Sequence, residues 1–397
     1  MTRLGGFTAA LACAMAAGCS GAPPRAAAPI EALPAQPAQP AQGNPFEGAD
    51  FYVDPAYSTQ VESTVRVTPA RSAQLRKLES VPTAIWLDSI AAVGGVARAL
   101  DDALARQRQS GKPVVTVLVV YDLPERDCAA SASSGELAQS AGGEGRYETE
   151  FIEPLAAQLR AHASQRVVVV VEPDSLANIA TNGSIAKCAA ADGVYRRSIA
   201  MAIRRLSMPS VWLYLDAAHA AWLGWTRNRA KIAQIYRDVL TQAGGLDKVR
   251  GFATNVSNYD TLRGGDIARL EPSDPCPDEL TYVEKLGASL AEVGIVGKGF
   301  LVDTSRNGRA GIRSKSGSWC NVKGAGLGER PQASPVAGVD AYWWIKPPGA
   351  SDGGSDPASP GYDPNCGAAD SLPGAPRAGQ WFDAQLLQLV DNANPPL

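Results

Sequence analysis

Carboxyl side chains follow the apolar runs of this sequence at many points. They are Asp88, Asp122, Asp127, Glu172, Asp174, Asp216 and Asp303, and Asp352 lies beyond the last run. Cleavage of a glycosidic bond needs a carboxylic acid. Tryptophans lie at or near the same positions, namely Trp86, Trp222, Trp225, Trp319, Trp343 and Trp344. An indole ring packs well against the apolar face of a sugar, so the combination predicts a carbohydrate site.

The elements that must position these residues alternate along the chain. Short β-rich runs cover Thr83–Leu87, Val114–Tyr121, Arg166–Val171, Val211–Leu215, Gly251–Thr254, Gly299–Val302 and Ala341–Ile345. Helical patterns lie between them, for example at Val93–Gln107, Tyr147–His162, Tyr195–Leu206 and Thr226–Ala243. Such runs suit strands buried on both faces of a parallel sheet. The alternation predicts an α/β fold, either a (β/α) barrel or a doubly wound sheet.

A polar or charged residue follows each of these seven runs. In a barrel the carboxyl ends of the strands converge on one mouth, where catalytic groups gather. The simpler interpretation is that an acid after a strand caps the next helix, and for a single aspartate that interpretation is preferred. Seven polar strand ends together favour the mouth of a barrel.

Several function classes are disfavoured by what the sequence lacks. It has no Gly-x-Gly-x-x-Gly after the early strands, no Walker motif and no Gly-x-Ser-x-Gly elbow, which removes the usual nucleotide and α/β-hydrolase interpretations. Lys and Arg total 37 and Asp and Glu total 40, so no basic excess points to nucleic acid. With two histidines in the chain, we expect no metal site and no cofactor.

The N-terminal 43 residues are expected to serve export rather than folding. Residues 1–19 read as a signal peptide that ends in Ala16-Ala17-Gly18-Cys19, and Cys19 is the predicted lipidation site of a bacterial lipoprotein. Ordinary cleavage near Ala14 or Ala16 is the alternative. Residues 20–43 form an Ala, Pro and Gln-rich linker, and residues 44–397 form the folded domain. The protein is therefore expected to be secreted or lipid-anchored at the cell envelope, with membrane contact only through the lipid.

Five cysteines remain in the exported body: Cys128, Cys188, Cys276, Cys320 and Cys366. Export makes disulfides plausible, and five is an odd number, so at least one thiol should stay free. None shows Cys-x-x-Cys spacing, which argues against a zinc site. The spacing alone does not decide the pairing.

Several longer segments resemble glycoside hydrolase family 6, and the chain is identified as a bacterial member of that family. They are Val120–Ala130, Val170–Leu176, Leu215–Trp225, Ala253–Tyr259, Trp319–Asn321 and Lys346–Gly353, in the family's order. The resemblance runs from about Asn44 to Leu397. It implies a distorted seven-stranded parallel (β/α) barrel in a single catalytic domain. It also implies cleavage of β-1,4-glucan, as in cellulose or cello-oligosaccharides, with inversion at the anomeric carbon.

The resemblance also implies catalytic roles. Asp174 would be the general acid, Asp127 would help to hold its proton, and Arg126 would keep Asp127 ionised. Asp352 would be the candidate base, at roughly 6.5–9.5 Å from the acid as inversion requires. Ser133 would hold the attacking water, and Tyr121 would crowd the reactive sugar out of its relaxed chair.

The resemblance further implies substrate contacts and disulfides. The sugar contacts would be Trp86, Asp88, Trp319, Lys346, His219, Trp222, Asn255 and Trp225. The disulfides would join Cys128 to Cys188 and Cys320 to Cys366, which leaves Cys276 unpaired. One departure is Ala350, where the family usually has a glutamate that contacts the sugar.

Two loops decide in this family whether the cleft is a closed tunnel. The intervals Asp127–Tyr147 and Lys346–Cys366 have the lengths typical of cellobiohydrolases, which predicts processive attack from chain ends by a monomer. The alternatives are an endo-acting glucanase on cellulose, mixed-linkage β-glucan or xyloglucan, and a non-catalytic glycan-binding lipoprotein.

Overall fold

The strands of the described chain lie in one nine-stranded sheet in the order β1-β3-β4-β5-β6-β7-β9-β8, with β2 paired to β3 as well. The computed structural model describes residues 41–265 and 267–397. All neighbours are parallel except β8 and β9. The strands are β1 (Asp50–Phe51), β2 (Ile85–Leu87), β3 (Val114–Val120), β4 (Arg166–Val171), β5 (Val211–Asp216), β6 (Gly251–Thr254), β7 (Gly299–Asp303), β8 (Gln332–Val336) and β9 (Val339–Trp343).

Alternate side chains of the central strands enter two different apolar clusters. Val115, Val117 and Val119 of β3 pack inside the curled sheet with Tyr214 and Trp343. Their neighbours on β3 and β4 pack outward against the helices, namely Leu118, Val120, Val167, Val169 and Val171. Because successive strand residues point to opposite faces, a continuous run of valines fills both layers.

The sheet curls into a distorted barrel. β1 pairs with the first residues of β3, and β2 pairs with the last ones. An isolated parallel bridge joins Thr83, just before β2, to Trp344, just after β9. The backbone N–H of Ala84 donates to the carbonyl of Trp344 at 3.1 Å. The two sides of the sheet therefore meet at this point, which excludes the doubly wound alternative.

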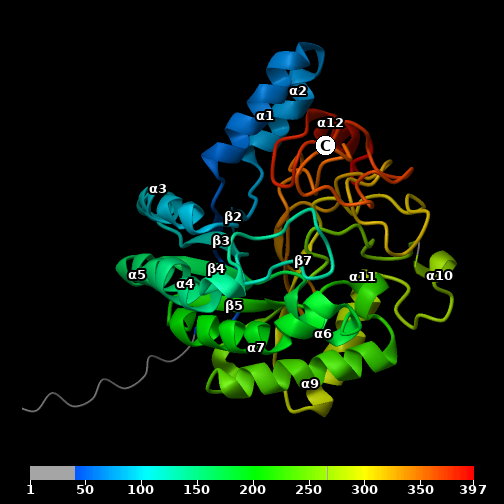
Figure 1. Ribbon diagram of the computed structural model, residues 1–397. Coiled ribbons are helices and arrows are strands. Elements are labelled where there is room, and N and C mark those ends of the chain that lie inside the picture. Colours follow the sequence, from blue (N-terminus) through cyan, green and yellow to red (C-terminus); the bar gives the residue numbers. More distant parts are fainter. Residues whose placement is uncertain (1–40, 266) are drawn as a thin grey trace, which may run out of the picture. The chain divides into compact units, whose positions relative to one another are not determined.

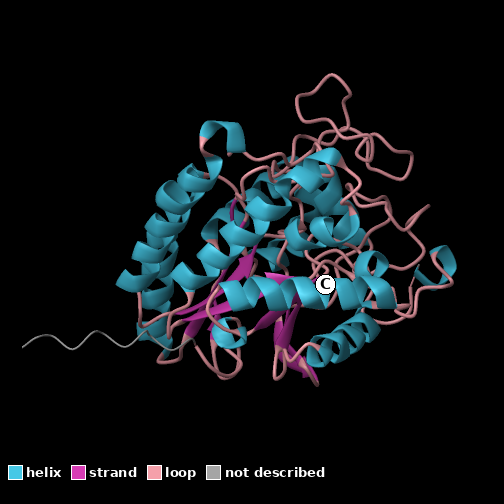
Figure 2. Cartoon of the chain, turned by 60° about the horizontal axis from the view of Figure 1, so that its bottom comes forward, coloured by secondary structure: helices cyan, strands magenta, loops and turns pink. Residues whose placement is uncertain are grey.

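Helices surround the sheet, as Figures 1 and 2 show. Figure 1 places α5, α7 and α9 along one side, whereas α1, α2 and α12 gather at another. The helices are α1 (Pro55–Val67), α2 (Ser72–Leu75), α3 (Val96–Ser110), α4 (Gly143–Arg146), α5 (Glu153–Ala161), α6 (Ser175–Thr181), α7 (Ala186–Leu206), α8 (Ala220–Leu223), α9 (Thr226–Gln242), α10 (Ile267–Leu270), α11 (Glu279–Glu292) and α12 (Asp383–Asp391). Within the described ranges, no helix is both long and apolar enough to cross a membrane.

The predicted parallel strands are confirmed, β4 and β6 with the predicted ends. The sequence patterns missed β1 and β8, so the count of seven was too low. The predicted helix Tyr147–His162 is split between the π-helical η5 (Tyr147–Ile152) and α5. Most of the predicted export segment and linker, including Cys19, lies outside the described residues.

Candidate active site

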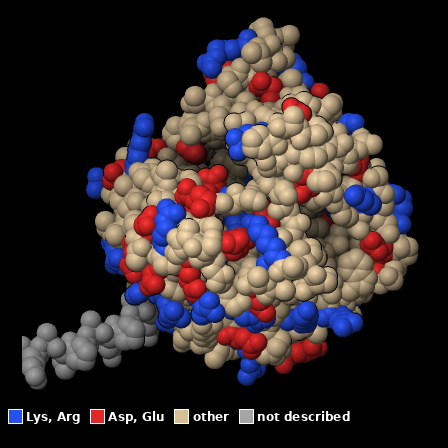
Figure 3. Space-filling model, viewed as in Figure 1, with Lys and Arg blue, Asp and Glu red and all other residues tan. Residues whose placement is uncertain are grey.

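A cavity of about 480 Å³ lies at the carboxyl ends of the strands. A hollow is visible on the face shown in Figure 3, with acidic and basic side chains beside it. Eleven of the predicted site residues line the cavity: Trp86, Tyr121, Asp127, Ser133, Asp174, His219, Trp222, Trp225, Trp319, Lys346 and Asp352. Residues that follow several different strands thus meet around one cavity.

Asp174 lies between β4 and α6 with a left-handed backbone, at φ 65° and ψ −12°. Its backbone N–H donates to Asp216 Oδ2 at 2.9 Å. Burial raises the pKa of the Asp174 carboxyl well above its usual range, and the charges of Asp216 and Asp127 raise it further. A carboxyl whose pKa is raised in this way has the property that a general acid needs. Left-handed backbone is uncommon for residues with a side chain and gathers at functional sites.

Asp216, at the end of β5, is a neighbour that the predicted site left out. It is 4% exposed and accepts hydrogen bonds from the backbone N–H groups of Asp174 and Ala218. Burial raises its pKa to about 7, although both hydrogen bonds lower it. Two carboxyls so close do not both ionise easily, so Asp216 helps to keep the proton on Asp174.

Asp127 is held by Tyr121, whose hydroxyl donates to Asp127 Oδ2 at 2.8 Å. Burial raises the pKa of Asp127, while the hydrogen bonds from Tyr121 and Ser133 and the charge of Arg126 lower it. Arg126 does not bond to Asp127 directly. It donates to the carbonyls of Ser133 and Asp88 at 2.8 and 2.9 Å and stacks on Tyr121 at 4.3 Å. Arg126 therefore acts mainly by fixing the loop that carries Asp127.

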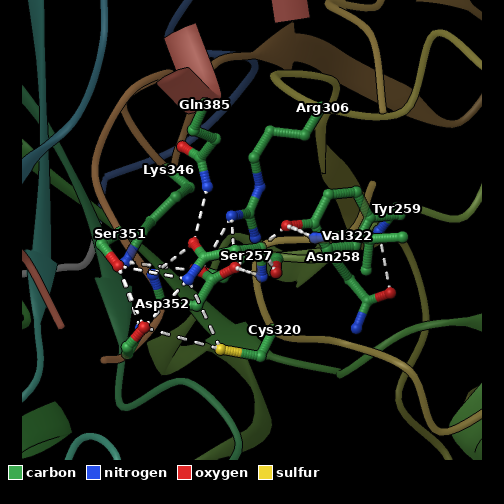
Figure 4. Close-up of polar contacts among 12 residues, drawn as sticks. Ser257, Asn258, Tyr259, Arg306, Cys320, Val322, Lys346, Ser351, Asp352 and Gln385 are labelled. Carbon is green, nitrogen blue, oxygen red and sulfur yellow. Dashed lines mark hydrogen bonds and ion pairs between the residues drawn. The ribbon is translucent and has the colours of Figure 1, made fainter. Parts of the chain in front are cut away.

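Asp352 is bonded through both carboxylate oxygens. Arg306 Nη1 donates to both of them at 2.8 Å. Asp352 Oδ2 also accepts from the Tyr259 hydroxyl at 2.9 Å and from the Asn321 N–H at 2.8 Å. Lys346 Nζ lies 3.9 Å from Asp352 Oδ1. Figure 4 shows these side chains converging on Asp352, and such charge-assisted bonds hold its carboxyl group in place.

The predicted sugar platforms surround these carboxyls. Trp86 donates to the Ile345 carbonyl at 2.8 Å, and Lys346 Nζ lies 4.9 Å from the centre of its ring. Trp222 donates to Thr181 Oγ1 at 2.8 Å. Each indole N–H is thus used by the protein, which fixes the ring and leaves its face for a sugar.

Four other residues that were named from the sequence do not line the cavity. Asn255 has no exposed surface, and its amide nitrogen donates to the carbonyls of Asp260 and Asp303. Asp88 is exposed but is not among the residues around the cavity. Trp343 and Trp344 are fully buried in the core. Asn258, three residues after the buried Asn255, lines the cavity.

Further polar residues around the cavity were not predicted. They are Asn178, Thr181, Asn182, Asn228, Ser257, Asn258 and Ser316. Asn178 and Thr181 lie on α6, directly after Asp174, so one short helix carries Asp174 at its N-terminus and part of the wall. Single asparagines and threonines on a helix carry no pattern in the sequence that separates them from surface residues.

The disulfides join Cys128 to Cys188 and Cys320 to Cys366, and Cys276 is a buried free thiol. Cys128 directly follows Asp127, so the first disulfide ties the root of the Asp127 loop to α7. The second ties the segment of Trp319 to the loop that follows Asp352. Within residues 41–265 and 267–397, no group of three or more His, Cys, Asp or Glu side chains is arranged to hold a metal ion.

A buried carboxyl behind the cavity makes the stability of the fold depend on pH. Burial and the charge of Glu172 raise the pKa of Asp122 to about 8, far above the usual value of an unfolded aspartate. The folded state keeps this proton while the unfolded state has lost it, so the free energy of unfolding falls as pH rises between these two values. We expect Asp122→Asn to lose less thermal stability than the wild type between about pH 5 and about pH 9.

Thermal melts at the two pH values measure this difference. The exposed Asp247 offers the control Asp247→Asn, which should follow the wild type. An Asp122→Asn variant that melts with the wild-type pH dependence would contradict the interpretation.

A buried acid beside a second carboxyl, in a cavity walled by tryptophans, defines a glycoside hydrolase. The comparison with known families agrees. Residues 46–393 match the family described as Glycosyl hydrolases family 6. The chain belongs to glycosyl hydrolase family 6.

Relatives in the family are similar over most of the chain. A protein of Emericella nidulans named 1,4-beta-D-glucan cellobiohydrolase C is 40% identical over 365 residues, which are 89% of this chain and 79% of that protein. Exoglucanase 3 of Agaricus bisporus is 38% identical over 358 residues, 89% of this chain and 80% of that protein. Both are fungal, so the prediction of a bacterial member is not confirmed.

A solved structure shares the fold. Cellobiohydrolase II from Humicola insolens, in complex with glucose and cellotetraose, aligns with a TM-score of 0.85 and 37% identity. The alignment covers 89% of this chain and 100% of that one. The distorted barrel predicted from the resemblance is thus confirmed.

Proposed function

We propose that this glycoside hydrolase cleaves β-1,4-glucosidic bonds of cellulose and cello-oligosaccharides with inversion, in the manner of a cellobiohydrolase. The single observation that carries the proposal is Asp174, protonated by burial and by neighbouring carboxyls inside a tryptophan-walled cavity. Asp174 donates its proton to the bridging oxygen, and that C–O bond breaks as water attacks the anomeric carbon from the opposite face. The relatives named as cellobiohydrolases support the substrate.

The other carboxyls take complementary roles. Asp127, held by Tyr121 and Ser133, supports the positive charge that develops on the sugar ring. Asp352 is the proposed base, which receives the proton of the attacking water directly or through a second water. Its ion pair with Arg306 holds it in position for this purpose. Ser133 lines the cavity beside Asp127 and holds the attacking water.

Contact between the two loops over the site supports attack from chain ends. Asp363, in the loop after Asp352, accepts a hydrogen bond from the Ser131 N–H at 3.0 Å. A β-carbon at Gly353 would lie 2.8 Å from Ala132 Cβ, so the loops touch there too. Ala129, Ala130 and Ser133 of the first loop line the cavity. We propose that this joined pair of loops roofs the cleft, which favours a threaded chain over internal cuts.

Replacing Asp363 by alanine should convert part of the activity to internal cleavage. Loss of one charge-assisted hydrogen bond weakens the loop contact, and we expect the ratio of soluble to insoluble reducing ends from amorphous cellulose to fall by roughly threefold. Hydrolysis of cellotetraose should stay unchanged. Asp356→Ala, an exposed change in the same loop, is the control. An unchanged ratio in Asp363→Ala would remove the support for a roof.

We also propose that the protein is exported, acts as a monomer and is lipidated at Cys19. The support is the apolar segment before Cys19 and the linker that follows it. The mass of the mature N-terminus distinguishes lipidation from ordinary cleavage.

Cellohexaose tests the function directly. The purified enzyme should release mainly cellobiose, and proton NMR of the first product should show the α-anomer. A first product in the β-form would reject inversion, and binding without any turnover would support a glycan-binding protein instead.

A further inference from the structure

A chain of buried polar side chains stands behind the wall of the cavity at His219. His219 lies between β5 and α8, and its Nδ1 atom is 2.8 Å from Asp260 Oδ2. The same oxygen accepts from the Ala221 N–H at 2.8 Å, and Asp260 Oδ1 accepts from Arg313 Nη2. Asp260 and Arg313 are 1% and 3% exposed, so this ion pair is shielded from water.

Asn258 fixes the other side of the His219 ring. Its amide oxygen accepts from the Tyr259 N–H at 2.8 Å, as Figure 4 shows, and from Arg313 Nη1 at 3.4 Å. The amide nitrogen is thereby turned toward His219 Nε2, at 2.9 Å. An amide nitrogen only donates, so His219 Nε2 must accept, and the single ring proton sits on Nδ1 and points at Asp260.

The electrostatics of the neighbourhood keep the charge on Asp260. Burial alone would raise its pKa, but the charge of Arg313 and the hydrogen bonds from His219 and the Ala221 N–H bring it below its usual range. Glu279, buried next to it, has its pKa raised well above the usual range by burial and by the charge of Asp260. The pair therefore holds one negative charge, and Asp260 carries it.

We propose that Asp260 and Arg313 are positioning residues for substrate binding. They hold His219 as a neutral ring with its proton on Nδ1, and His219 in turn holds the amide nitrogen of Asn258 toward the cavity. The second N–H of that amide then donates to a sugar hydroxyl. Both His219 and Asn258 line the cavity. The inference deepens the proposed function and rests on it for the identity of the ligand.

Arg313 also links this wall to the rest of the site. It belongs to the segment after β7 that carries Trp319, and Arg306 of the same segment pairs with Asp352. Two buried guanidinium groups of one segment thus form ion pairs with carboxylates that follow β6 and β9. Each carboxylate stands behind or beside the substrate cavity.

The state of His219 can be measured without any substrate. The chain has two histidines, so a sample labelled with ¹⁵N-histidine gives two ring systems, and His162→Gln assigns them. We expect His219 to carry a proton on Nδ1 and none on Nε2. A proton on Nε2, or a doubly protonated ring, would overturn the proposal. Asn258→Asp presents an acceptor to Nε2 and should produce the doubly protonated ring.

Kinetics separate positioning from a general loss of structure. Asp260→Asn and Arg313→Gln should raise KM for cellohexaose by roughly 3- to 10-fold, as expected for loss of one hydrogen bond, and leave kcat nearly unchanged. We place the Asn258 contact on the leaving-group side of the cut. The rate on 2,4-dinitrophenyl β-cellobioside should therefore not change, because its leaving group has no sugar hydroxyls. Arg309→Gln, an exposed change in the same segment, is the control.

Equal losses on both substrates, or no loss on either, would overturn the positioning role. If Asp260→Asn does not fold, Arg313→Gln and the wild-type NMR result still decide. A wild type inactive on cellohexaose would reject the proposed function instead, and the NMR result would remain a test of the ring state.

Discussion

Asp174→Asn is expected to lower kcat on cellohexaose by about 10²- to 10⁴-fold, the usual contribution of a general acid. The glucosyl leaving group needs a proton because its conjugate acid is weak. Asparagine has nearly the same shape as the protonated carboxyl, and the backbone hydrogen bond to Asp216 does not involve the side chain. The loss should therefore be chemical rather than structural, and equal thermal stability of the two proteins checks this.

A substrate with a good leaving group sharpens the test. 2,4-Dinitrophenolate leaves without a proton, so Asp174→Asn should lose far less activity on 2,4-dinitrophenyl β-cellobioside than on cellohexaose. The wild-type rate on cellohexaose should fall at high pH, where Asp174 loses its proton, and Asp174→Asn should lack that fall. Asp216→Asn removes the neighbouring charge that raises the pKa of Asp174. The rate of this variant on cellohexaose should therefore begin to fall at a lower pH than the wild-type rate. Equal losses of Asp174→Asn on both substrates would contradict the role of acid.

The fold was predictable because its strands are short and uniformly apolar. Val167 to Val171 can only be a strand buried on both faces, and β4 begins and ends where that pattern does. β8 escaped prediction because its residues alternate between exposed and partly buried, and β1 has only two residues. Both lie at the margins of the sheet, where the tertiary context decides the pairing.

The sequence could not predict which carboxyl at a strand end lines the cavity and which one has a structural role. Asp174 and Asp303 both follow a buried strand, but Asp303 accepts backbone hydrogen bonds from Ser257, Ser305 and Lys346 and holds neighbouring strand ends together. Asp174 instead lines the cavity. The capping interpretation fails for both, because in the described chain no helix follows β7 before β8 and the Asp174 side chain makes no capping bond to α6. Only the three-dimensional arrangement of the loops separates them.

Asn255 and Asn258 are a second pair of residues that the sequence could not tell apart. They lie three residues apart in one segment, yet the first is buried beneath the wall and the second lines the cavity. The backbone of Asn255 is left-handed, at φ 60°, and the next residues turn back toward the mouth. No pattern of residue types encodes that turn, so the choice between the two asparagines could not be made from sequence.

Replacing Arg306 by methionine is expected to be among the most destabilising single changes, at about 3–5 kcal/mol of unfolding free energy. Arg306 is fully buried, and its guanidinium stacks on Tyr259 at 4.4 Å. Methionine can fill much of the space, but it leaves the Asp352 carboxylate, 6% exposed, with only the more distant Lys346 Nζ at 3.9 Å. Breaking a buried pair costs far more than the pair contributes against an apolar replacement, because one charge is left uncompensated.

Urea unfolding measures the loss, with Arg309→Met as the matched control from the same segment. Arg309 is exposed, and its change should stay within about 0.5 kcal/mol. Adding Asp352→Asn to Arg306→Met removes the uncompensated charge, so the double variant should regain part of the stability although it loses the proposed base. If Arg306→Met is no less stable than Arg309→Met, the ion pair does not hold Asp352 in place, and the argument that Arg306 positions the proposed base fails with it.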